Sequence, residues 1–292
     1  MVQHAVEFEV AGPWSLDRSR EFWEELAPLA PASAAGAAEQ VRTVFHADAD
    51  WRRVAAEVTQ YGSTARVVVV GDGDLDAAAE QVRRFLSLDV DARGWPTVAE
   101  RDPVIADVQA RWPGLRPCGF HSPYEAATWA VLTQRTGMTS ARRMRDDLVS
   151  RYGTDGAFPS PEALLGLDFE LPWRKTEYLH SVADAALDGL LDGARLRALG
   201  PAAAVRQVQQ VKGLGVFSAE LVVLRGANHP DTLPTQERRL EAEITERYGP
   251  GRGLAEVSEN WRPYRTWAAL HLRVLHGERM GPTAARPARA DR

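Results

Sequence analysis

The chain has 292 residues, of which 45% are hydrophobic and 26% charged, a composition typical of a globular protein. It has no unbroken apolar run long enough for a membrane span, and its start lacks the pattern of a secretory signal, so we expect a cytoplasmic protein. The single cysteine, Cys118, excludes an intrachain disulfide and a cysteine-cluster metal site.

Charge is divided unevenly along the chain, although the net charge is only −5. The first 100 residues hold 17 Asp and Glu against 9 Lys and Arg, whereas the rest holds 23 against 26. This asymmetry indicates two modules and is a weak sign of a polyanionic partner for the second. Arginines that only solvate helix faces would explain it equally well.

The first 95 residues predict a mixed α+β domain. Alternating or β-branched residues predict strands over 5–10, 39–48, 51–62 and 65–74, although 51–62 is also compatible with a helix. Helical spacing predicts helices over 19–30 and 75–89. The stretch GDGD at 71–74 lacks the spacing of a nucleotide-binding loop, and its acids would repel phosphate.

Residues 96–280 predict a helical domain, because the β pattern ends and Gly and Pro separate short helical segments. The predicted helices cover 101–114, 122–137, 139–153, 160–167, 174–191, 194–199, 201–211, 217–227, 236–249 and 257–277. Ser122, Pro123 and Glu125 form a capping-box pattern. The polar tail at 281–292 is predicted to be disordered.

The stretch VKGLGVFSAELVVLRG, residues 211–226, predicts a tight turn between two helices. Gly213 and Gly215 flank Leu214, which can enter the core while the glycines take conformations closed to other residues. Backbone N–H groups would then be available to bind a phosphate along the turn and the start of the next helix. This segment runs from Lys212 to Ser218 and includes Val216 and Phe217. A plain tight corner between helices would show the same pattern.

This stretch resembles the helix–hairpin–helix, which clamps the DNA backbone, although Lys212 stands where the motif usually has Pro. The resemblance extends over about residues 85–276 to the helix–hairpin–helix DNA glycosylases of the AlkA type. Four segments in the family's order carry it: YEAATWAVLTQRTG, FPSPEALLGLDFE with RKTEYLHSVADAALDG, the hairpin, and WRPYRTWAALHL. It implies a TBP-like sheet domain before the helical module, duplex DNA at the bacterial nucleoid as partner, and a monomer.

The resemblance also implies base excision by a monofunctional enzyme. Such an enzyme flips a damaged, alkylated purine out of the duplex and hydrolyses its glycosidic bond. The family's essential Asp lies 22 residues after the second hairpin glycine and six after another Asp, Asp231 here, which leads to Glu237. Counting from Pro234 leads to Gln236 instead. Glu237 could equally be a solvated acid at a helix start.

Further family positions depart from the pattern. Gln134 is followed by Arg135, where AlkA-type enzymes place an apolar side chain that fills the gap in the duplex; a surface role for Arg135 fits as well. Arg273 occupies an aromatic pocket position, where its charge would repel a cationic base and favour a neutral one. Phe217, Trp129 and Tyr124 are candidate pocket walls, or core residues.

No cofactor is expected from the side chains. The histidines are too scattered for a metal site, although the family resemblance implies a monovalent Na+ or K+ at the hairpin backbone. A lysine suited to a Schiff base is also missing, since Lys212 lies inside the turn. Two other hypotheses stay open: a damaged-DNA-binding protein that kept the hairpin and lost catalysis, and a helical protein without a DNA role.

Overall fold

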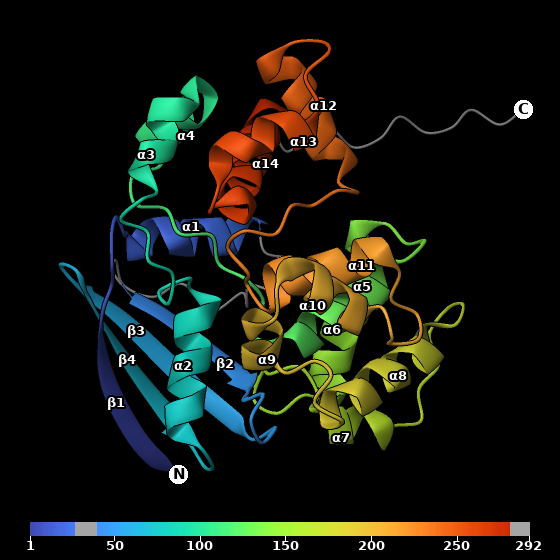
Figure 1. The fold of residues 1–292 in the computed structure, drawn as a ribbon. Helices are drawn as coiled ribbons and strands as arrows, with labels where there is room; N and C mark the ends of the chain where they lie inside the picture. The colour runs from blue at the N-terminus through green and yellow to red at the C-terminus, as the bar shows by residue number, and fades with distance from the viewer. Residues whose placement is uncertain (27–39, 281–292) are drawn as a thin grey trace, which may run out of the picture.

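The computed structural model describes residues 1–26 and 40–280. A four-stranded sheet with two helices lies beside two further groups of helices (Figure 1). The predicted tail at 281–292 and the end of the helix predicted over 19–30 lie outside the described residues.

The sheet is antiparallel, in the order β1-β4-β3-β2. Its strands are β1 (Val2–Glu9), β2 (Gln40–His46), β3 (Arg53–Tyr61) and β4 (Thr64–Gly71). In β3, Val54, Ala56 and Val58 are all buried, which is the two-residue period of a strand and rules out a helix there. Helices α1 (Leu16–Leu26) and α2 (Leu75–Phe85) share one hydrophobic core with this face.

The remaining helices are short, as the Gly and Pro punctuation predicts. They are α3 (Pro96–Arg101), α4 (Pro103–Arg111), α5 (Pro123–Thr133), α6 (Met138–Tyr152), α7 (Pro161–Leu165), α8 (Lys175–Leu187), α9 (Gly193–Ala198), α10 (Pro201–Val208), α11 (Val216–Leu221), α12 (Arg238–Tyr248), α13 (Leu254–Val257) and α14 (Arg265–Met280). A π-helical turn, Val222–Gly226, extends α11, and a 3-10 turn, Ser258–Trp261, follows α13.

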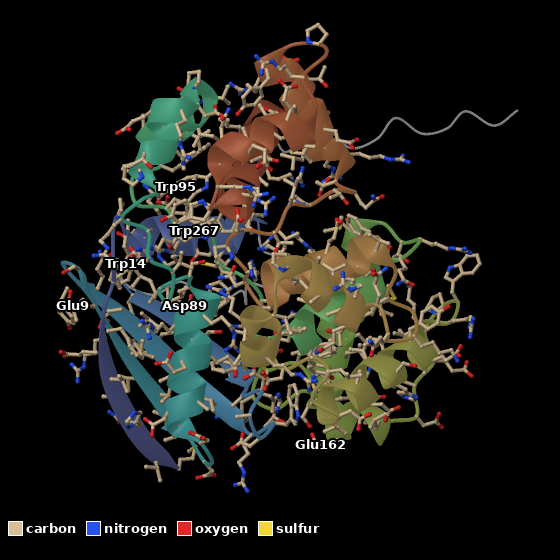
Figure 2. The ribbon with its side chains drawn as sticks, viewed as in Figure 1. Glu9, Trp14, Asp89, Trp95, Glu162 and Trp267 are labelled. Carbon is tan, nitrogen blue, oxygen red and sulfur yellow. The ribbon has the colours of Figure 1, made fainter. Side chains whose placement is uncertain are left out.

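These helices form two hydrophobic clusters. The central cluster joins residues from α5 to α11, and the outer cluster joins residues from α3 and α4 with residues from α12 to α14. In the outer cluster the rings of Trp95 and Trp267 lie 5.7 Å apart, edge to face (Figure 2). The chain thus leaves the sheet, enters the outer cluster, crosses to the central cluster and returns. The boundaries of the two predicted domains, residues 1–95 and 96–280, stay predictions.

The predicted capping box before α5 forms only in half. The Ser122 hydroxyl accepts a hydrogen bond from the backbone N–H of Glu125 (3.2 Å). The Glu125 carboxylate does not return to the cap; it binds Nδ1 of His121 at 2.9 Å instead. That imidazole also contacts the hydroxyl of Thr43 on β2 (2.6 Å), so the pair connects the sheet to the central cluster.

Acid is expected to destabilise the fold through His271. This side chain is buried in α14, and burial lowers its pKa from 6.5 to about 4. In the unfolded chain His271 binds a proton below about pH 6.5, whereas in the folded protein it stays neutral until the pH falls to about 4. The free energy of unfolding should therefore fall as the pH drops through this window, by up to about 3 kcal/mol.

Urea unfolding at pH 7 and pH 4.5 measures this effect. His271→Gln removes the titrating group while keeping a polar side chain, so the variant should lose less stability between the two pH values than the wild type. An equal loss in both proteins would show that His271 does not carry the effect.

Candidate functional site

The turn between α10 and α11 depends on one glycine. Gly213 has a φ of +94°, and a Cβ there would lie 2.4 Å from Cγ of Tyr178. Both the backbone conformation and this contact therefore require glycine. Leu214 is buried in the central cluster, as its position between the glycines predicts. Gly215 differs from the prediction, because its φ of −81° and its open surroundings suit other residues.

The start of α11 presents an exposed surface. The side chains of Val216 and Phe217 are 45% and 50% exposed, high values for large apolar residues. The backbone N–H groups of residues 216–218 have no backbone acceptor among the described residues, as is usual at the start of a helix. This surface can therefore receive hydrogen-bond acceptors from outside the protein.

Two polar side chains of the turn lie in surroundings that the sequence did not predict. Lys212 places its ammonium 2.5 Å from the carboxylate of Glu177 on α8. Ser218 is buried within α11 and does not cap the helix, which has no side-chain cap.

The loop after α5 lies against this turn. The Gln134 amide donates to the carbonyl of Gly213 at 2.8 Å, and the buried ammonium of Lys175 donates to three carbonyls at the end of α5 at 2.6 to 3.0 Å. Arg135 is exposed, with its guanidinium 5.5 Å from the ring centre of Trp173. Trp173 is 72% exposed. Sequence reasoning missed it, although an aromatic residue between Pro and Arg–Lys at a helix start was a usable signal.

A cavity of about 430 Å³ lies between the central and outer clusters. Its lining comes from both clusters and mixes aromatic, aliphatic and charged side chains: Phe120, Trp129, Thr133, Met138, Phe217, Glu220, Leu221, Leu224, Arg225, Pro234, Glu237, Arg239, Leu240, Ala269, Leu270 and Arg273. Its volume fits a small organic ligand.

The cavity brings together two of the three predicted aromatic walls. Trp129 and Phe217 line it, and Phe120, which sequence reasoning missed, lines it too. Tyr124 does not. Its ring is 2% exposed and packs against Trp51 and Phe158, and its hydroxyl donates to a backbone carbonyl at 3.0 Å. Tyr124 is therefore a core residue, which corrects the prediction.

Glu237 and Arg273 face each other in the cavity wall. The Glu237 carboxylate caps α12 by accepting from the N–H of Arg239 at 3.2 Å, and its Oε2 lies 3.8 Å from Nε of Arg273. Both side chains are about a quarter exposed, at 28% and 24%. Gln236, the alternative position, is exposed and is not part of the cavity lining.

A second carboxylate, Glu220 on α11, holds the loop that leads to Glu237. Glu220 is 7% exposed and accepts hydrogen bonds from the N–H of Thr235 (3.0 Å) and from the Thr235 hydroxyl. The sequence carried no sign of this role, because the partners are far apart in the chain. Glu220 therefore links the hairpin helix to the loop on the other side of the cavity.

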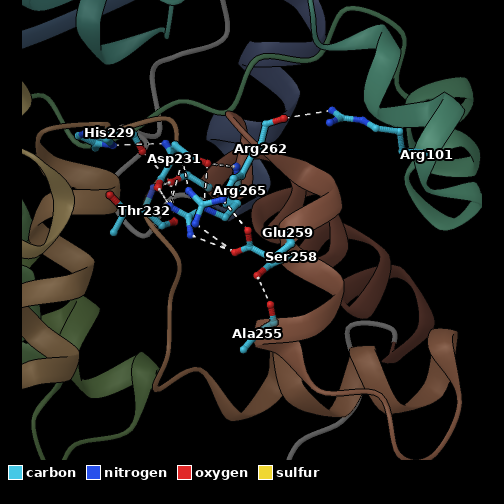
Figure 3. Close-up of polar contacts among 10 residues, drawn as sticks. Arg101, His229, Asp231, Thr232, Ala255, Ser258, Glu259, Arg262 and Arg265 are labelled. Atoms are coloured by element: carbon cyan, nitrogen blue, oxygen red, sulfur yellow. Dashed lines mark hydrogen bonds and ion pairs between the residues drawn. The ribbon is translucent and has the colours of Figure 1, made fainter.

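An ion-pair cluster fixes the other end of this loop (Figure 3). The Asp231 carboxylate accepts from the backbone N–H of Arg265 (3.1 Å) and from its guanidinium (2.9 and 3.0 Å). Arg262 adds a longer contact at 3.3 Å and also binds Glu259. The segment before Glu237 is thus held at both ends, against α14 and against α11.

Across residues 1–26 and 40–280, no helix is long and apolar enough to cross a membrane, and no group of three or more His, Cys, Asp or Glu could hold a metal ion. The hairpin carbonyls of Val211 and Gly213 each accept one hydrogen bond. A carbonyl oxygen has a second lone pair, so these atoms suit a monovalent cation. That cation stays a prediction.

No family model matches the sequence. The chain is 29% identical over 244 residues to a Mycobacterium tuberculosis protein named "probable bifunctional transcriptional activator/DNA repair enzyme AlkA", which covers 76% of this chain and 48% of that protein. It is 23% identical over 215 residues to a DNA-3-methyladenine glycosylase of Bacillus subtilis, covering 67% of this chain and 71% of the relative. The chain thus spans about half the length of the first of these relatives.

Solved structures share the fold. A 3-methyladenine DNA glycosylase from Archaeoglobus fulgidus superposes with a TM-score of 0.70 at 18% identity, over 93% of this chain and 98% of that one. A Schizosaccharomyces pombe 3-methyladenine DNA glycosylase in complex with abasic DNA gives 0.51 at 23% identity, over 60% of this chain and 92% of that one. In sequence this chain is thus similar to proteins named AlkA and DNA-3-methyladenine glycosylase, and its fold is that of the solved 3-methyladenine DNA glycosylases.

Proposed function

We propose that this protein is a monofunctional DNA glycosylase that hydrolyses the N-glycosidic bond of a damaged purine in duplex DNA. The observation that carries the proposal is the cavity itself. It joins a carboxylate to three aromatic side chains, and Phe217 lies both in its wall and on the exposed start of α11. The relatives named DNA-3-methyladenine glycosylase support the same reaction.

Binding would begin at the hairpin. The free N–H groups of residues 216–218 would donate hydrogen bonds to a DNA phosphate, and Lys212 and Arg135 would add positive charge nearby. Gln134, Arg135 and Trp173 lie on the adjoining surface, where they would probe the gap left by the flipped nucleotide. The protein would act on DNA as a monomer, at the nucleoid.

In the cavity the flipped base would stack on the aromatic side chains, and Glu237 would stabilise the positive charge that develops on the sugar as the C1′–N bond breaks. The electron pair of the C1′–N bond would leave with the base, and water would add its oxygen to C1′ and lose one proton. A neutral damaged base would take up that proton as it leaves, whereas a cationic base would leave as a neutral molecule and the proton would pass to solvent. The chain has two lysines. Lys175 is bound to three carbonyls and Lys212 to a carboxylate, and neither lines the cavity, so no Schiff base is expected.

One observation favours a second candidate, a damaged-DNA-binding protein without catalysis. The ion pair with Arg273 offsets part of the negative charge that Glu237 would offer to the sugar. Release of free base from duplexes carrying alkylated or deaminated purines decides between the two. Release supports the glycosylase. Binding that weakens with salt, without release of any base, supports the binding protein, and absence of salt-dependent binding contradicts both.

Glu220→Ala tests whether the Glu220–Thr235 contact positions the loop. The substitution removes both hydrogen bonds to Thr235, so we expect base release to slow about tenfold, with a loss of stability of roughly 1 kcal/mol. Single-turnover release and urea unfolding measure the two effects. Glu220→Gln keeps an acceptor and a donor for Thr235 and should stay near the wild type; equal losses in both variants would contradict a positioning role.

A further inference from the structure

The charged side chains of the cavity wall differ in how many of their hydrogen-bonding groups already have partners within the protein. Glu220 is occupied by Thr235 on both oxygens, and Glu237 caps α12. Arg225 donates to the carbonyl of Cys118 (3.1 Å), with its guanidinium over the ring of Phe120. These groups are largely committed to partners within the protein.

Arg273 differs from them. Within the described part of the chain it donates no hydrogen bond; its Nε lies 3.8 Å from Oε2 of Glu237, and the charge of Glu243 also acts on it. It lies on α14 and is 24% exposed in the wall of the cavity. A guanidinium carries five N–H donors and no acceptor. Because the described residues supply no hydrogen-bond acceptor for Arg273, a ligand in the cavity that carries acceptors can bind these donors.

Electrostatics within the cavity point the same way. The lining contains three guanidiniums, of Arg225, Arg239 and Arg273, against the two carboxylates of Glu220 and Glu237. The lining therefore carries one more positive than negative charge, although Arg239 is exposed to solvent, and this excess disfavours a cationic base. Among the aromatic residues of the lining, Phe217 is 50% exposed, and its ring can stack on an uncharged aromatic base, whereas Phe120 and Trp129 are each 4% exposed.

The donor geometry narrows the class of base. An arginine fork matches two neighbouring acceptors, as in its paired hydrogen bonds to O6 and N7 of guanine. Alkylation at N7 removes that acceptor lone pair and gives the purine a positive charge. Such a purine cannot accept the second hydrogen bond of the fork, and the guanidinium repels it.

We propose, resting on the proposed function, that Arg273 selects uncharged purines that keep N7 free and carry an acceptor at position 6. Hypoxanthine has this edge, and 7-methylguanine lacks it. Arg273 is thus a specificity residue that disfavours the binding of cationic alkylated purines in the cavity.

The test compares single-turnover release of hypoxanthine and of 7-methylguanine from matched duplexes, each as the enhancement over spontaneous release. The wild type should favour hypoxanthine at least tenfold. Arg273→Trp should lower the hypoxanthine enhancement at least tenfold and raise that of 7-methylguanine. Arg273→Lys keeps the charge and loses the fork, so it should lose hypoxanthine release and still reject 7-methylguanine.

Arg66→Trp, the same substitution at an exposed site on β4, is the matched control and should keep the wild-type preference. A wild type that favours 7-methylguanine, or an Arg273→Trp variant with an unchanged ratio, would overturn the inference and leave the proposed function intact. Release of neither base, nor of any other damaged purine, would overturn the proposed function itself. The ratio of the two bases does not respond to a uniform loss of folded protein.

Discussion

Replacing Glu237 by Gln is expected to slow base release by about 100-fold to 1,000-fold, the usual loss when a preorganised charge is removed from a developing transition-state charge. The amide keeps the length of the side chain and an oxygen that can accept from the N–H of Arg239, so the start of α12 should survive. Stability should therefore change by less than about 1 kcal/mol. Single-turnover release and thermal unfolding, measured on the same preparations, separate the two effects.

Two matched variants sharpen this experiment. Gln236→Ala changes the neighbouring exposed residue, which does not line the cavity, and should release base at the wild-type rate. Glu237→Asp restores the family's acid but withdraws it by one methylene, so an intermediate rate is expected. If Gln236→Ala abolished release and Glu237→Gln did not, the acid would be wrongly assigned.

Gly213→Ala is expected to disrupt the hairpin. The new methyl group would meet the ring of Tyr178 at 2.4 Å, on a backbone with a φ of +94° that disfavours any side chain. Overpacking and backbone strain together should cost roughly 2–5 kcal/mol of stability. We also expect duplex affinity to fall at least tenfold, because the displaced turn carries the free N–H groups of α11. Urea unfolding and fluorescence anisotropy at two salt concentrations measure these effects.

Gly215→Ala is the control for this variant. Its Cβ would meet nothing within 4 Å and its backbone is extended, so stability should stay within about 1 kcal/mol of the wild type. If Gly215→Ala lowers DNA affinity without lowering stability, the turn itself contacts DNA. Tyr178→Ala combined with Gly213→Ala should recover part of the lost stability, and a Gly213→Ala variant as stable as the wild type would contradict the steric argument.

Much of the fold follows from short-range rules that act within a few residues. The alternation in β3 and β4, the Ser122 cap of α5 and the Gly and Pro punctuation of the helices are all local. Each depends on backbone geometry and on neighbours three or four positions away, so the sequence alone predicts them. The candidate site does not follow from such local rules. Glu237 was predicted from the resemblance to a family and from the number of residues between it and the hairpin.

The partners of the site residues could not be predicted in this way. Glu220 meets Thr235, and Glu237 meets Arg273, only because α11, α12 and α14 come together around one cavity. Tyr124 turned out to be core, whereas Phe120, four residues earlier, lines the cavity.

The sequence by itself predicted the strands, most of the helices and the turn at Gly213. Only the tertiary structure decided which side chains share the cavity. The reason is physical: caps and periodicity are set by interactions along one segment, while a cavity is set by which faces of distant helices pack against each other.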